Sequence, residues 1–231
     1  MIRKIKFIYL PWHKLRLFIN KQKEKQKKRA YVKYGNETLR IICNVIRENG
    51  YKIAVTEGTL LGLVRDCGLI PWDDDLDFLI LDDGNVPWDN LENNLKKKGF
   101  WKYREKRCGN ELISQAYKFR KVHCDFVKWN MSEDVICIDY GCYEYDNVSY
   151  ENNREAYYKV WEIEVPSIKE LVYKEIGDVQ IPVPKNSEEI LTAIYGEWKI
   201  PDSKYKPNRI ERKKKFVFTY YTKHGKIRKH M

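Results

Sequence analysis

The chain has 231 residues, of which 43% are hydrophobic and 14% aromatic, a composition typical of a folded globular protein and not of a disordered one. This length allows one sizeable hydrophobic core, with room for a small accessory lobe. No apolar stretch of the sequence approaches the roughly 20 residues that a membrane-spanning helix needs.

The net charge of +11 is distributed unevenly along the chain. Residues 1–30 carry a net charge of +10 and residues 206–231 a net charge of +9, so the middle of the chain, 31–205, carries −8. A nucleic-acid-binding core would need a basic groove through the folded part, and the acidic middle therefore argues against nucleic acid as a partner. The sequence predicts a folded body at 31–205 between two basic extensions.

The N-terminal extension, 1–30, mixes aliphatic and aromatic side chains with lysine and arginine. This pattern is typical of a segment that lies on an anionic membrane surface, and the alternatives are a signal peptide or a solvated helix packed on the body. Pro11 predicts two short segments here instead of one long helix. We expect a cytoplasmic protein that is peripheral on the inner face of the cell membrane. The C-terminal extension either touches the same surface or is a disordered basic tail.

Caps and apolar periodicity outline the body. Asn36 and Ser187 are expected to be helix N-caps, and Gly50 and Gly99 are expected to follow helix C-termini. Residues 100–150 are predicted to be rich in strands, and residues 151–165 give no clear pattern. The predicted helices cover 36–49, 59–65, 89–98 and 187–195, and the other predicted strands cover 51–56, 78–81 and 178–184.

Four aspartates, Asp73, Asp74, Asp75 and Asp77, stand within five residues, directly before the apolar run 78–81. At neutral pH they repel one another unless a positive charge offsets them. Side chains alternate along a strand, so Asp73, Asp75 and Asp77 are expected on one face. Carboxylates at a sheet edge favour Mg²⁺ or Mn²⁺, and the alternative is a solvated acidic turn.

Gly58 and Thr59 precede the short helix predicted at 59–65. Free backbone amides and the positive end of a helix dipole attract phosphate at such a turn. Thr59 is equally compatible with an ordinary helix cap, and Gly58 with an ordinary turn glycine.

A further acid, Asp125, interrupts the strand-like run 122–129. A carboxylate in a buried strand is costly unless it is paired or bound to a metal. Asp125 is therefore either a metal ligand or the partner of Arg120 or Lys128 in a salt bridge.

Two segments, Glu-Gly-Thr-Leu-Leu-Gly-Leu-Val-Arg at 57–65 and Gly-Leu-Ile-Pro-Trp-Asp-Asp-Asp-Leu-Asp at 68–77, resemble the LicD-type phosphotransferases. This family includes bacterial phosphocholine transferases and fukutin-like proteins. Residues 122–127 and 183–201 extend the resemblance, so that it spans 54–201. One departure is Asp66, where many relatives carry histidine.

The resemblance implies an α+β, nucleotidyltransferase-like fold in which a small mixed β-sheet is flanked by helices. The catalytic domain would occupy 31–205, between the basic N-terminal segment 1–30 and the basic C-terminal tail 206–231. The resemblance also implies that Asp75, Asp77 and Asp125 bind Mg²⁺ or Mn²⁺.

The implied reaction moves a phospho-alcohol, such as phosphocholine, from a CDP-activated donor to a hydroxyl of a cell-surface glycan or glycolipid, releasing CMP. Asp125 or Asp73 would accept the proton of that hydroxyl. Gly58 and Thr59 would contact phosphate oxygens.

Two further residues of the motif have alternative roles. Arg65 would either pair with the diphosphate or form a salt bridge with Asp66. Trp72 would either stack on a base or sugar or pack against the body.

Two other functions remain open. The same carboxylates would serve a nucleotidyltransferase that moves a nucleoside monophosphate to a small acceptor, and a degenerate relative would be a non-catalytic, membrane-associated scaffold in polysaccharide assembly. The six cysteines include no Cys-x-x-Cys pair, which favours free thiols in a reducing compartment over a zinc site.

Overall fold

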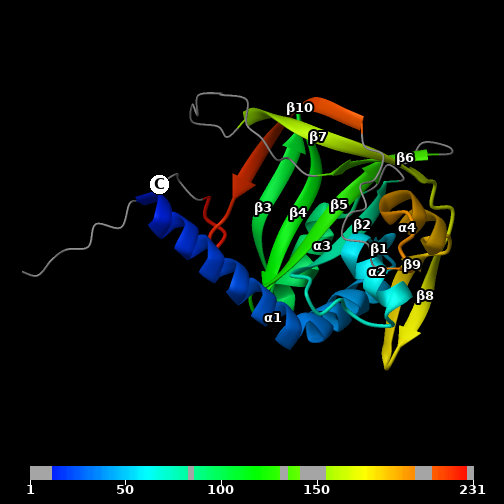
Figure 1. Cartoon of the computed structure of the whole chain (residues 1–231). Coiled ribbons are helices and arrows are strands. Elements are labelled where there is room, and N and C mark those ends of the chain that lie inside the picture. The colour runs from blue at the N-terminus through cyan, green and yellow to red at the C-terminus, as the bar shows by residue number, and fades with distance from the viewer. Residues whose placement is uncertain (1–11, 83–85, 131–134, 141–154, 201–209, 228–231) are drawn as a thin grey trace, which may run out of the picture.

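The computed structural model describes residues 12–82, 86–130, 135–140, 155–200 and 210–227 (Figure 1). These residues form a mixed α+β fold, as predicted. An eight-stranded sheet has the strand order β1-β2-β5-β4-β3-β10-β7-β6, and β8 and β9 form a separate hairpin. Neighbouring strands of the large sheet are antiparallel except for β2 and β5, which are parallel.

The helices are α1 (Trp12–Asn49), α2 (Glu57–Arg65), α3 (Trp88–Lys97) and α4 (Ser187–Tyr195). The strands are β1 (Ile53–Val55), β2 (Asp75–Asp82), β3 (Trp101–Cys108), β4 (Glu111–Phe119), β5 (Val122–Asn130), β6 (Val135–Tyr140), β7 (Glu155–Pro166), β8 (Leu171–Ile176), β9 (Val179–Pro184) and β10 (Ile210–Tyr220).

The parallel strands β2 and β5 lie at the centre of the core. Their apolar residues are buried apart from the partly buried Val127, and Phe78 of β2 stacks on Phe126 of β5 with ring centroids 4.8 Å apart. The C-terminal part of α1 buries Ile42 and Ile46, and this helix contacts β2, β5 and β9 (Figure 1). Burying side chains of this size is worth about 1.5–3 kcal/mol each, so the core fixes the ends of β2 and β5 where the aspartates stand.

Helix α1 differs from the prediction. The prediction that Asn36 begins a helix was wrong, because Asn36 lies in the middle of one 38-residue helix. Two features of the chain explain why the helix extends so far toward the N-terminus. The Lys/Glu/Gln-rich run at 21–28 consists of good helix formers, and Tyr31 and Gly35 are buried against the body. The helix crosses residue 30, the predicted domain boundary, without a break, and Pro11 lies outside the described residues.

Two further predictions were corrected near the C-terminus. The expectation of a disordered tail was wrong for residues 210–220, because β10 pairs with β3 and β7 inside the large sheet. The expectation that Ser187 caps α4 was also wrong. Asn186 occupies the N-cap position without a side-chain cap bond, and the Ser187 hydroxyl donates to the carbonyl of Pro184.

Candidate active site

The parallel pairing of β2 and β5 brings three aspartates together. Asp77 lies directly opposite Asp125 in the register, and Asp75 lies one pleat earlier on the same face of β2. One oxygen from each of the three carboxylates lies within 4.8 Å of the others, and all three residues are half-buried. Carboxylates as close as this fit a single divalent cation.

The backbone of β2 is fixed where the aspartates begin. The amide of Thr56 donates to the carbonyl of Asp77 at 3.0 Å, and the amide of Asp77 donates to the hydroxyl oxygen of Thr59 at 2.9 Å. Thr59 is fully buried. The Thr59 side chain therefore anchors the strand that carries Asp77.

Gly58 makes room for the carboxylate of Asp73. A Cβ atom on Gly58 would stand 2.4 Å from Asp73 Oδ2, closer than real atoms approach. The other oxygen of that carboxylate, Oδ1, accepts a hydrogen bond from the amide of Asp74 at 2.9 Å. Asp73 thus rests against the first turn of α2, where the sequence predicted a phosphate contact at Gly58.

A lysine from α1 provides a positive charge beside the acidic motif. Lys27 Nζ donates to Asp74 Oδ1 and to Asp75 Oδ2, each at 2.8 Å. Burial lowers the pKa of Lys27, but the charges and hydrogen bonds of Asp75 and Asp74 outweigh this, so the net pKa is raised. Sequence reasoning missed this residue, because Lys27 is one of many cations in the N-terminal segment.

A second positive charge comes from β3. Tyr103 is an extra residue in the pairing of β3 with β4, because the register shifts between Lys102 and Arg104. Such a bulge re-aims the neighbouring side chains. Arg104 Nη2 lies 3.0 Å from Asp125 Oδ2, and the Tyr103 hydroxyl donates to Asp125 Oδ1 at 3.4 Å.

The predicted salt bridge between Asp125 and either Arg120 or Lys128 was wrong, because both cations pair with other carboxylates. Arg120 pairs with Glu37 at 2.9 Å, and Lys128 pairs with Asp82 at 2.8 Å.

His123 lies two residues before Asp125 on the same face of β5, opposite Asp75 in the register. Burial and the charge of Lys118 lower the pKa of His123 to about 3. Its Nδ1 lies 3.3 Å from the Tyr103 hydroxyl. The Tyr103 hydroxyl thus lies between the imidazole and the Asp125 carboxylate.

Burial and mutual repulsion disfavour the simultaneous ionisation of these carboxylates. Burial raises the pKa of Asp75 to about 6, with Lys27 partly opposing the rise and Asp125 adding to it. Burial raises the pKa of Asp77 well above its ordinary value, and the charges of Glu57 and Asp75 raise it further. A divalent cation would relieve this repulsion, and its preferred ligands are oxygen atoms such as these.

Aspartates alone make up the side-chain clusters suited to a metal ion within the described ranges. The cysteines described there, at positions 43, 67, 108 and 124, are free thiols. The donor set therefore fits Mg²⁺ or Mn²⁺ better than zinc.

Arg65 and Trp72 lie in different environments. Arg65 donates from Nε and Nη2 to the two carboxylate oxygens of Asp66, at 2.8 and 2.7 Å, so its guanidinium is engaged by its neighbour. Trp72 is 65% exposed, so the prediction that it packs against the body was wrong. Its ring is accessible to a ligand.

Glu57 is a further acid that sequence reasoning did not assign. It is the first residue of α2, with a φ of 47°, a left-handed conformation that is unfavourable for a residue with a side chain. Its negative charge raises the pKa of Asp77. Strained backbone of this kind is concentrated at functional sites.

Aspartates on neighbouring parallel strands of a mixed sheet form a carboxylate site suited to a divalent cation. A family model described as "LicD/FKTN/FKRP, nucleotidyltransferase domain" matches residues 50–186, and the chain belongs to this family. The match includes all three aspartates and excludes the whole of α1. The chain is thus a transferase of the LicD kind.

The other comparisons add little. Among solved structures, the Megavirus polyadenylate synthase is 18% identical with a TM-score of 0.31, over 55% of this chain and 28% of that chain. A likeness this weak supports no conclusion. A search of curated proteins gave no match.

The raised pKa of Asp77 predicts how the metal-free protein responds to pH. The native state holds a proton that the unfolded chain releases, so this group makes the protein less stable as the pH rises above about 4. Asp77→Asn removes this effect. It should raise the free energy of unfolding by about 1–3 kcal/mol at pH 8 and by less at pH 5, measured by denaturant titration in EDTA.

The matched control is Asp178→Asn. The Asp178 side chain is 81% exposed and lies 3.7 Å from Arg40. Its substitution should therefore change the free energy of unfolding by no more than about 0.5 kcal/mol at either pH value. A variant at position 77 that is less stable than the wild type at pH 8 would contradict the account of the acidic cluster.

Proposed function

We propose that the chain transfers a phospho-alcohol, such as phosphocholine, from a CDP-activated donor to a hydroxyl of a cell-surface glycan or glycolipid, with release of CMP. The observation that carries this proposal is the convergence of Asp75, Asp77 and Asp125 on two parallel strands, inside the segment that matches the LicD family.

The three aspartates hold Mg²⁺ or Mn²⁺ in this proposal. When bound, the divalent ion neutralises negative charge on the transferred phosphorus and on the leaving CMP. The backbone amide of Gly58, in the first turn of α2, binds a phosphate oxygen, whereas the fully buried Thr59 acts through its hydroxyl bond to the amide of Asp77.

Asp73 accepts the proton of the incoming hydroxyl. Burial raises the pKa of Asp73, which makes its carboxylate a better base. The carboxylate of Asp125 is less suited to that role because Arg104 and Tyr103 already bind it. The exposed ring of Trp72 offers a stacking surface for the cytosine or a sugar.

The direct test incubates the protein and Mg²⁺ with CDP-choline, CDP-glycerol, CDP-ribitol or CDP-ethanolamine and a glycan acceptor, and follows CMP by ³¹P NMR. Asp77→Asn and Asp125→Asn should each lower turnover by about 10³-fold or more, because each removes a metal ligand. The exposed Asp178→Asn should retain wild-type turnover.

Other outcomes would contradict the proposal. Consumption of CTP with release of pyrophosphate would identify a nucleotidyltransferase. A protein whose melting temperature responds neither to Mg²⁺ or Mn²⁺ nor to cytidine nucleotides would be a scaffold. Turnover above about a tenth of wild type in both aspartate variants would reject the metal assignment.

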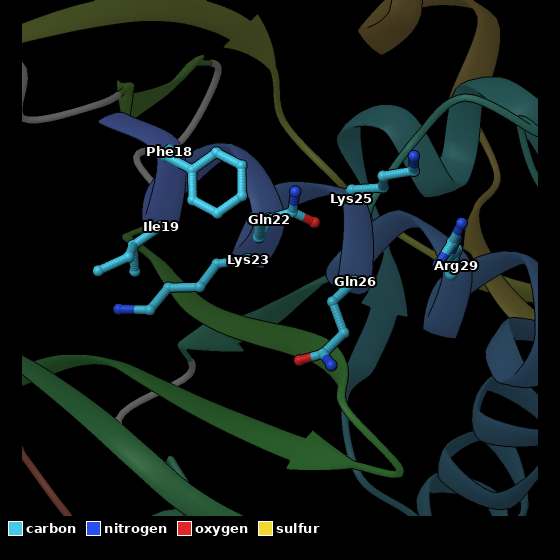
Figure 2. Close-up of a pocket in the computed structure, with 7 residues that line it drawn as sticks. All are labelled: Phe18, Ile19, Gln22, Lys23, Lys25, Gln26 and Arg29. Carbon is cyan, nitrogen blue, oxygen red and sulfur yellow. The ribbon is translucent and has the colours of Figure 1, made fainter. Parts of the chain in front are cut away.

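We further propose that the N-terminal part of α1 lies on the anionic inner face of the cell membrane. Figure 1 shows this end of the helix at one side of the sheet. Leu15, Leu17, Phe18 and Ile19 are all at least 40% exposed. Figure 2 shows Phe18 and Ile19 beside Lys23 in a hollow along the helix.

Apolar side chains among lysines suit attachment to a surface of anionic lipid. None of the helices in the described ranges is long and apolar enough to cross a membrane.

The membrane contact is tested by substitution, because truncation would also remove Lys27. The double variant Leu17→Ser, Phe18→Ser should lower binding to vesicles containing phosphatidylserine by about tenfold or more, since each change forfeits about 1.5–3 kcal/mol of apolar burial. Ile200→Ser, at an apolar residue that is 70% exposed, is the control and should bind like the wild type. Equal binding by all three proteins in a sedimentation assay would contradict this placement.

A further inference from the structure

Helix α1 contributes two side chains to the acidic site, although the family match begins only at residue 50. Lys27 and Tyr31 are four residues apart on this helix, so their side chains lie on the same face. The helix contacts β2 and β5, the two strands that carry the three aspartates. One face of α1 therefore lies beside the site.

Lys27 stands at hydrogen-bonding distance from one of the three aspartates. Its Nζ lies 2.8 Å from Asp75 Oδ2 and 2.8 Å from Asp74 Oδ1, and its side chain is 21% exposed. An ammonium group has three N–H donors, and two of them are directed at these oxygens. A phosphate bound at the Asp75 carboxylate through a divalent ion would come within reach of the third.

Tyr31 has a buried hydroxyl without a hydrogen-bond partner among the described residues. The residue is 2% exposed. Burial raises the pKa of Tyr31, and the negative charges of the aspartates, Asp73 foremost, raise it further. Native proteins rarely leave a buried hydroxyl unpaired, and the O–H of Tyr31 is suited to donate to an anionic oxygen.

The opposite side of the site also carries a positive charge. Arg104 of β3 contacts Asp125 at 3.0 Å, and its Nε atom is buried without a partner in the described structure. Lys27 and Arg104 therefore flank the three aspartates from two different elements. Each of these cations offers charge-assisted hydrogen bonds to phosphate oxygens, and their positions on two elements suit a ligand with more than one phosphate group.

We propose that α1 forms one wall of the active site and that Lys27 and Tyr31 bind phosphate oxygens of the diphosphate donor next to Asp75. This inference rests on the proposed function, since it takes a diphosphate as the substrate. The other explanation of Lys27 is a counter-charge that stabilises the acidic motif and never touches a ligand. The two explanations differ in what happens to pyrophosphate binding when the charge is removed.

The test uses Mn²⁺ and inorganic pyrophosphate as probes, measured by titration calorimetry on the full chain. Lys27→Met should weaken binding of pyrophosphate in saturating Mn²⁺ by at least about tenfold, because a charge-assisted hydrogen bond is lost. Its affinity for Mn²⁺ alone should be unchanged or higher, because a competing cation has been removed. Lys27→Arg should restore most of the pyrophosphate affinity.

Lys25→Met is the matched control, since it removes the same charge from an exposed residue two positions earlier on the helix. It should leave both affinities at the wild-type level. Equal weakening by the variants at 27 and 25 would show a general charge effect and overturn the assignment of Lys27. If Lys27→Met bound pyrophosphate like the wild type, Lys27 would be only a counter-charge to the acidic motif. That result would also overturn its assignment as a phosphate ligand.

Tyr31→Phe separates the hydroxyl from the packing of the ring. It should weaken pyrophosphate binding by about three- to tenfold while the melting temperature stays equal or rises, because an unpaired buried hydroxyl is removed. Unchanged pyrophosphate binding would exclude Tyr31 from the ligand contacts. These measurements involve no CDP-alcohol, so they test the role of α1 independently of the proposed reaction. If the transfer assay failed but the variants weakened pyrophosphate binding as expected, the proposed reaction would be rejected while the phosphate-binding role of α1 would stand.

Discussion

Repulsion among carboxylates on β2 and β5 is the constraint on which the site depends. The parallel register places Asp77 opposite Asp125 and keeps Asp75 on the same face, while the packed core beneath them prevents the strands from moving apart. Burial then penalises each negative charge and raises the pKa of both Asp75 and Asp77. The fold keeps these groups together at a cost in stability, which is typical of functional sites.

Positive charge reaches this cluster from outside the acidic motif. Lys27 comes from α1 and Arg104 from the bulge in β3, and each pairs with one side of the cluster. The segment matched to the family supplies the aspartates and Arg104, whereas Lys27 lies before it. Because the proposed membrane-binding residues also lie on α1, this one helix would connect the membrane surface to the active site.

Local patterns in the sequence singled out the three aspartates, but the metal role of Asp125 was predicted from the resemblance to the LicD family and not from a local pattern. Alternation along a strand placed Asp75 and Asp77 on one face, and an acid inside an apolar run singled out Asp125. The partners of these residues depend on the tertiary structure. Lys27 is 48 residues from Asp75, and no local pattern distinguishes it from the neighbouring lysines. The bulge that directs Arg104 toward Asp125 is a register shift between two strands, which a single strand's sequence does not reveal.

Crystals soaked in Mn²⁺ and measured at the manganese absorption edge test the central claim most directly. The account predicts one anomalous peak bound by carboxylate oxygens of Asp75, Asp77 and Asp125, at about 2.0–2.6 Å, as expected for a hard divalent cation. An ion bound only by Asp73 and Asp74, or no peak between β2 and β5 at saturating Mn²⁺, would contradict it.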